Sequence, residues 1–124
     1  MTHIFDDVIY TYTRNNMLED GFIIDVTTSA KAHGFKIPVG ITKNVWDEFI
    51  EIDKVLEDNE VRLNNILQMA FPAAKNNLNV DRVYFKVMCV NGNNGILEEV
   101  SLIMSCGPAD DLTPCITIMC SDDD

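Results

Sequence analysis

The best candidates for a chemical or binding role in this chain are acidic residues, and seven of them lie in one short stretch. They are Asp47, Glu48, Glu51, Asp53, Glu57, Asp58 and Glu60, and the only base among them is Lys54. A row of carboxylates can occupy a basic groove on a partner protein that otherwise binds nucleic-acid phosphates, and complementary fields speed such an encounter. The simpler interpretation is a solvated acidic face that aids solubility. The sequence leaves both interpretations open.

A second set of polar residues, Arg14, Asp20, Asp25 and Asp110, could form a separate polar site. Carboxylates perform acid–base chemistry when their surroundings drive their pKa values apart, and a sequence does not show those surroundings. The structural alternative is helix termination at Asp20 and Gly21, an Asx-type turn at Asp110, and pairing of Arg14 with a nearby acid. We therefore assign no catalytic residue.

The thiols and imidazoles do not form a recognisable metal-binding or nucleophilic motif. The chain has four cysteines and two histidines, which are Cys89, Cys106, Cys115, Cys120, His3 and His33. No C-x-x-C pair occurs, whereas structural zinc sites usually show ligands paired at short spacing. Both histidines lie far from the cysteines in sequence, and no glycine-rich phosphate-binding motif is present. We predict four reduced thiols, no metal and no cofactor.

The overall charge narrows the class of partner. The 124 residues include 20 Asp+Glu and 9 Lys+Arg, which gives a net charge of −11. Such a surface repels nucleic-acid backbones and anionic membranes, so we expect a protein partner with a basic surface, no direct nucleic-acid contact and no membrane contact. No apolar run approaches the roughly 18 residues of a spanning helix. The N-terminus lacks a basic region followed by an apolar core, which favours a cytoplasmic location. The oligomeric state stays open.

In the first half of the chain, the elements that must position these residues are mostly short. A helix capped by Thr13 is expected to end near Gly21, followed by a strand over residues 22–26. Thr27 or Thr28 is expected to cap a brief helix over residues 29–33, and residues 37–41 suit a strand that is short or lies at a sheet edge.

Two stronger helices are predicted in the middle of the chain. The first begins after Thr42 and carries apolar residues through Ile52, because Val45, Phe49 and Ile52 recur at helical spacing. The second opens at Asp58 or Asn59 and continues to Ala74, with a kink or an end near Phe71 because Pro72 follows.

Three strands are predicted after Asp81. They cover residues 82–90, 96–105 and 114–120, and the residues between them favour turns. The fold class is therefore α+β, with N-terminal helices packed on a C-terminal antiparallel β-meander. We expect a single domain over residues 1–120 and an acidic tail over residues 121–124.

Three blocks of the sequence resemble a family of small uncharacterised proteins that occur on plasmids, phages and other mobile elements. The first block is Val8–Arg14 with Glu19–Gly21 and Ile24–Val26, and the second is Gly34–Val39 with Thr42, Val45 and Trp46. The third comprises Cys106–Asp111 and Pro114–Met119. The resemblance implies a mobile genetic element in a prokaryotic cytoplasm and brings no established activity.

These observations together favour a non-enzymatic, acidic interaction protein. We expect it to antagonise a host nucleic-acid-handling or defence protein by presenting a phosphate-mimicking surface formed by the acidic run. The competing hypothesis is a small enzyme or ligand-binding domain that uses polar residues of the N-terminal block and of Gly107–Asp111.

Overall fold

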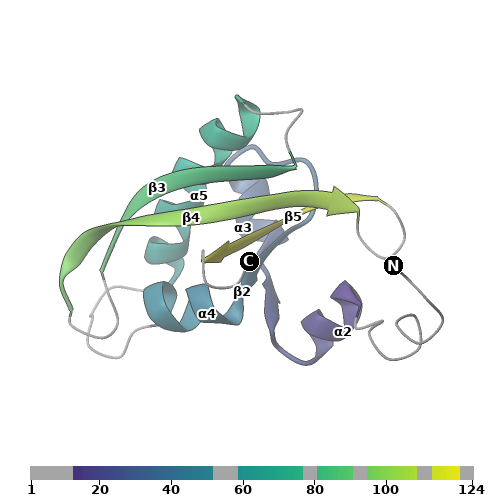
Figure 1. Cartoon of the computed structure of the whole chain (residues 1–124), viewed down its shortest axis with the longest axis horizontal. Helices are drawn as coiled ribbons and strands as arrows, with labels where there is room; N and C mark the ends of the chain where they lie inside the picture. The colour runs from purple at the N-terminus through teal and green to yellow at the C-terminus, as the bar shows by residue number, and fades with distance from the viewer. Residues whose placement is uncertain (1–12, 52–58, 77–80, 91–94, 109–112, 121–124) are drawn as a thin grey trace.

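The computed structural model describes residues 13–51, 59–76, 81–90, 95–108 and 113–120, and it combines helices with one sheet (Figure 1). The elements in chain order are α2 (Arg14–Glu19), β1 (Ile23–Asp25), α3 (Thr27–Ala32), β2 (Val39–Thr42), α4 (Lys43–Val45), the π-helix η1 (Trp46–Ile50), α5 (Asn59–Lys75), β3 (Arg82–Val90), β4 (Leu97–Pro108) and β5 (Pro114–Cys120). The predicted α+β class is confirmed.

The sheet has five strands in the order β1-β2-β5-β4-β3. Strands β3, β4 and β5 form the predicted antiparallel meander. The expectation of an antiparallel sheet is met only in part, because β1 pairs antiparallel with β2, whereas β2 pairs parallel with β5 through Val39 and Ile116. Strand β2 is short, as expected, but it lies inside the sheet, where neighbours on both sides satisfy its backbone groups. The sheet is therefore mixed.

One face of the sheet carries the main hydrophobic core. Along β3, buried Val83, Phe85 and Val87 alternate with exposed residues, as a strand covered on one face requires. Helix α5 lies against this face and buries Leu63, Ile66 and Leu67 among other residues. In Figure 1 α5 runs behind β3 and β4, whereas α2 lies apart from it at the other end of the molecule.

The helix predicted from Thr42 to Ile52 is shorter and less regular than expected. Thr42 is the N-cap, as predicted, but α4 has only three residues and continues as the π-helix η1, where the Glu51 N–H donates to the Trp46 carbonyl at 2.8 Å. The wider π turn changes the register, so Phe49 and Ile50 are both buried at its end. Ile52 lies outside the described residues.

Two other local predictions are decided in part or in full. Helix α5 continues past Pro72 to Lys75, and the Asn76 N–H donates to the Pro72 carbonyl at 3.0 Å, so of the two outcomes expected near Phe71 the end of the helix is wrong. Helix α3 starts at Thr27, and the residue that supports its start is Asp25, which accepts hydrogen bonds from the Thr27 backbone and hydroxyl. Thr27 and Thr28 therefore do not cap this helix.

Candidate functional site

The structure divides the predicted acidic run among several environments. Asp47 forms an ion pair with Lys43 one turn earlier, and Glu60 in the first turn of α5 accepts a hydrogen bond from the Ser29 hydroxyl at 2.6 Å. Glu48 is half-buried on η1 and Glu51 is exposed just beyond it. Asp53, Glu57 and Asp58 lie outside the described residues.

The acidity of the chain is unevenly distributed along the sequence. The described ranges contain eight of the nine Lys+Arg residues but only ten of the twenty Asp+Glu residues. Their net charge is therefore −2, against −11 for the whole chain. Any acidic surface on the described residues is thus local, and Glu48 and Glu51 at the end of η1 are its clearest members from the predicted run.

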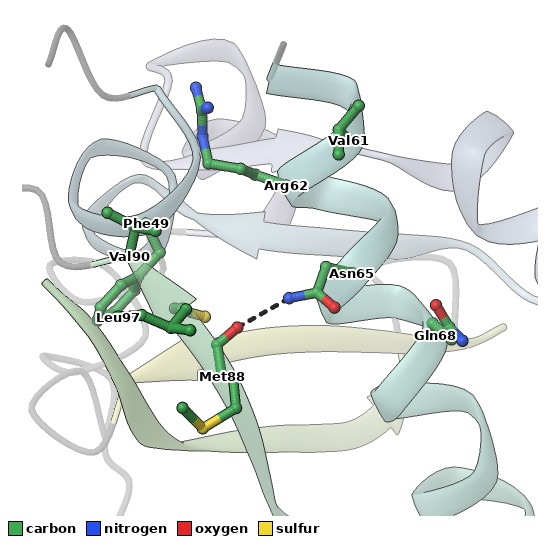
Figure 2. Close-up of a pocket in the computed structure, with 9 residues that line it drawn as sticks. Phe49, Val61, Arg62, Asn65, Gln68, Met88, Val90 and Leu97 are labelled. Carbon is green, nitrogen blue, oxygen red and sulfur yellow. Dashed lines mark hydrogen bonds between the residues drawn. The ribbon is translucent and has the colours of Figure 1, made fainter. Parts of the chain in front are cut away.

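A pocket lies between α5, η1 and the paired strands β3 and β4 (Figure 2). Its volume is about 400 Å³. We call it the α5–β3 pocket, and its lining residues are Phe49, Val61, Arg62, Asn65, Gln68, Met88, Cys89, Val90 and Leu97. Val61, Asn65 and Gln68 recur at helical spacing, so one face of α5 forms one wall of the pocket.

Two polar contacts hold the walls of the α5–β3 pocket together. The buried Arg62 donates from Nε to the Ile50 carbonyl, which ties α5 to the end of η1, and within α5 its Nη2 donates to Asn59 Oδ1 at 2.7 Å. Asn65 donates from Nδ2 to the Met88 carbonyl at 2.8 Å, as the dashed line in Figure 2 shows. Because Asn65 engages the backbone of β3, it fixes the distance between the helix and the strand.

The rim of the α5–β3 pocket is apolar and accessible to a partner. Val61, Met88 and Leu97 are 52%, 46% and 58% exposed. Exposed apolar side chains that surround a hollow are typical of interaction sites, where they receive an apolar anchor residue of the partner. No residue of this pocket was among the predicted site residues, although the spacing of Val61, Asn65 and Gln68 indicates the helix face that forms it.

The structure brings together only part of the second predicted set. Arg14 on α2 and Asp25 at the end of β1 lie within electrostatic range of each other. The pKa of Asp25 is held below its ordinary value chiefly by the hydrogen bond from the Thr27 hydroxyl, then by the Thr27 backbone N–H, and to a smaller extent by the charge of Arg14. Asp20 is the C-cap of α2, and Asp110 lies outside the described residues.

All four cysteines are free in the structure, and Cys89 and Cys115 are buried. Burial raises the pKa of the Cys89 thiol to about 11, and burial together with the nearby Asp81 and Cys115 raises the pKa of Cys106. Across the described ranges, the His, Cys, Asp and Glu side chains form no group of three or more that could hold a metal ion. No helix in the same ranges is long and apolar enough to cross a membrane.

Comparison with known proteins identifies the family. A family model described as a family of unknown function, DUF6573, matches residues 1–124. No curated protein and no solved structure gives a match. The resemblance seen in the three sequence blocks is therefore confirmed at the level of a family without an assigned function. Because the match spans its full length, the chain belongs to the DUF6573 family.

Proposed function

We propose that this chain is a non-enzymatic interaction protein of a mobile genetic element, and that it acts in the cytoplasm by binding a host protein with a basic surface. The observation that carries the proposal is the α5–β3 pocket, which combines exposed apolar residues with Phe49 of η1. Phe49 lines the pocket, and Glu48 and Glu51 flank it in the chain.

This combination suits a partner that handles nucleic acids or takes part in defence. Such a partner carries Lys and Arg side chains around its binding groove, and a surface that mimics phosphates would occupy that groove. The acids would speed the encounter, while an apolar anchor seated among Val61, Met88 and Leu97 would supply most of the affinity. Asp53, Glu57 and Asp58 complete the acidic run in sequence between η1 and α5.

The experiment is a capture assay at low salt with purified full-length chain and a prokaryotic host lysate. The test variant reverses Glu48, Glu51, Glu57 and Asp58 to Lys, which changes the net charge by +8, from −11 to −3. Neither Glu48 nor Glu51 belongs to the hydrophobic core, and substitutions outside the core usually change stability by no more than about 0.5 kcal/mol each, so we expect the variant to fold. We expect this variant to lose the partner that the wild-type chain captures. We also expect added double-stranded DNA to release that partner from the wild-type chain.

The matched control reverses Asp6, Asp7, Asp122 and Asp123 to Lys, which changes the net charge equally. It should keep the partner. If both variants retain the partner, the acidic run is only a solvated surface and the mimicry hypothesis is wrong. Wild-type capture should also weaken steeply between low and moderate salt, because a Debye length of about 8 Å at 0.15 M screens exposed charges.

A separate variant tests the apolar half of the interface. Leu97→Ser removes an exposed rim residue without opening the core, and we expect it to weaken capture while preserving the salt dependence. The matched control is Ile96→Ser, which alters the neighbouring residue, equally exposed but outside the pocket lining. Equal capture by both variants would exclude the α5–β3 pocket as the anchor site.

A further inference from the structure

A second pocket lies away from the α5–β3 pocket, where α2 meets the sheet. Its volume is about 500 Å³. The polar members of its lining are Arg14, Thr42, Lys43, Asn44, Ser105 and Thr117. Met17, Phe22, Ile23 and Met119 supply its apolar walls. We call it the Arg14 pocket. Its size is within the range of sites that bind small molecules.

The floor of the Arg14 pocket is formed by the face of the sheet that lies opposite the main core. Thr117 is paired with Ser105 on β4 and with Gly40 on β2, so the three residues form one row across the sheet. Their chain neighbours Ile116 and Ile118 are buried in the core on the other face. Because side chains alternate along a strand, the two hydroxyls point away from that core.

Arg14 is held over this row by contacts with the sheet. Its Nη2 donates to the Ile116 carbonyl at 3.0 Å and its Nε donates to the Thr117 hydroxyl at 3.3 Å. A Cβ at position 40 would lie 2.8 Å from Nη2, so only glycine leaves room for the guanidinium there. Arg14 therefore brings a positioned positive charge to the pocket, because bonds to the backbone and side chain of β5 restrict its rotamers.

The charge of the Arg14 pocket is opposite to that of the chain. The sequence has 20 Asp+Glu and 9 Lys+Arg, yet the part of the lining that the structure describes contains two bases and no acid. Two carboxylates lie near these bases, since Asp47 pairs with Lys43 and the charge of Arg14 acts on Asp25, but neither acid lines the pocket. The side chains of the lining that carry N–H groups are Arg14, Lys43 and Asn44, and the lining also includes hydroxyls.

From this arrangement we infer that the Arg14 pocket binds a small organic anion that carries an apolar group. The anionic group, a carboxylate or a phosphate, would lie near Arg14 and Lys43 and accept charge-assisted hydrogen bonds. The apolar part would lie against Met17, Phe22 and Met119. This activity is separate from the proposed binding of a basic protein, because the linings of the two pockets share no residue among those that the structure describes.

The experiment uses amide chemical shifts of the full-length protein labelled with ¹⁵N. Phenyl phosphate and phenylacetate serve as aromatic anions, benzyl alcohol as the uncharged analogue, and inorganic phosphate as the anion without an apolar part. We expect at least one aromatic anion to shift the amides of Asn44, Ser105 and Thr117 with saturation below about 10 mM, a concentration typical of weak binding. The uncharged analogue and inorganic phosphate should bind at least about tenfold more weakly. The relative affinity of the two aromatic anions distinguishes a phosphate ligand from a carboxylate ligand.

Matched lysine variants test the location of the site. Lys43→Gln removes an exposed base of the pocket, and Lys86→Gln removes an exposed base outside it; each lysine is ion-paired with one acid. Binding should weaken several-fold in the first variant and stay unchanged in the second. Thr117→Val keeps the shape of a floor residue and should also weaken binding. The inference is overturned if no probe shifts these amides by 10 mM, if benzyl alcohol binds as well as the anions, or if both lysine variants bind equally.

Discussion

The Arg14 side chain lies in the space that a side chain at position 40 would occupy, so its placement depends on the glycine there. A Cβ on Gly40 would be 2.8 Å from Arg14 Nη2 and 2.6 Å from Cγ2 of Ile23. Both distances are too short for ordinary contact. The lack of a side chain on a buried strand residue thus determines how α2 attaches to the sheet.

Gly40→Ala should consequently destabilise the protein by about 1–3 kcal/mol, as overpacking of a filled site does. The matched control is Gly107→Ala on β4, where an added Cβ would meet no neighbouring atom within 4 Å, and we expect a change within about 0.5 kcal/mol. Chemical denaturation of both variants measures the difference. Equal midpoints for the two variants would show that Arg14 moves aside without cost.

Phe71 should contribute more to stability than its partial exposure suggests. Its ring meets Phe35 edge to face with a centroid distance of 5.3 Å, and it closes over Gly34, where a Cβ would lie 2.8 Å from the ring. We expect Phe71→Ala to lower the free energy of unfolding by about 2–4 kcal/mol. Met69→Ala, at an exposed position on the same helix, should cost less than about 1 kcal/mol. A loss of under about 1 kcal/mol at Phe71 would contradict its role as a bridge between α5 and α3.

The sequence predicted the elements well where the signal was local. Thr13 caps α2 through a capping box with Asn16, and the alternation of Val83, Phe85 and Val87 matches the buried face of β3. It could not predict the parallel pairing of Val39 with Ile116, because that contact joins residues far apart in the chain and depends on the whole sheet. The π turn in η1 was also beyond reach, since the apolar spacing there fits an ordinary helix.

The candidate sites were predicted less completely for a related reason. The acids of the run can be read directly from the sequence, but their partners cannot. Asp47 pairs with Lys43 one turn earlier, whereas Glu60 meets Ser29 only through tertiary packing. Arg14 was singled out as a polar candidate, whereas its position over Gly40 depends on the register of β2 and β5. The apolar rim around Leu97 has no sequence signature of its own, because exposed and buried leucines look alike in a strand.

Asp25 should make stability depend on pH in the acid range. Its pKa is lowered in the folded state, chiefly by the hydrogen bond from the Thr27 hydroxyl, so its ionised form favours folding. That contribution is complete above the unfolded value, near 3.8, and is lost as the pH falls through the lower folded value. Asp25→Asn should therefore flatten the acid limb of a stability–pH curve, and Glu19→Gln on α2 serves as the exposed control. A carboxyl ¹³C titration that places the pKa of Asp25 at or above 3.8 would contradict this.

Cys89 should produce the opposite dependence at alkaline pH. Burial beside the α5–β3 pocket raises its pKa from 9.0 to about 11, so the folded chain keeps the thiol protonated while the unfolded chain ionises. The unfolded state then releases a proton that the folded state retains, and the free energy of unfolding should fall as the pH rises from about 9 to about 11. Cys89→Ala should be less stable at pH 7 but should show a shallower decline over this interval.

Alkylation provides an independent measurement on the same thiol. At pH 8 iodoacetamide should modify Cys89 in the native protein far more slowly than in the unfolded chain, because the thiolate is the reactive form and burial disfavours it. Mass spectrometry of each cysteine-containing peptide, with and without prior reduction, also reports whether all four cysteines are free thiols. Equal rates for native and unfolded protein at Cys89 would mean that the wall formed by α5 and β3 opens readily, and the alkaline prediction would then fail with it.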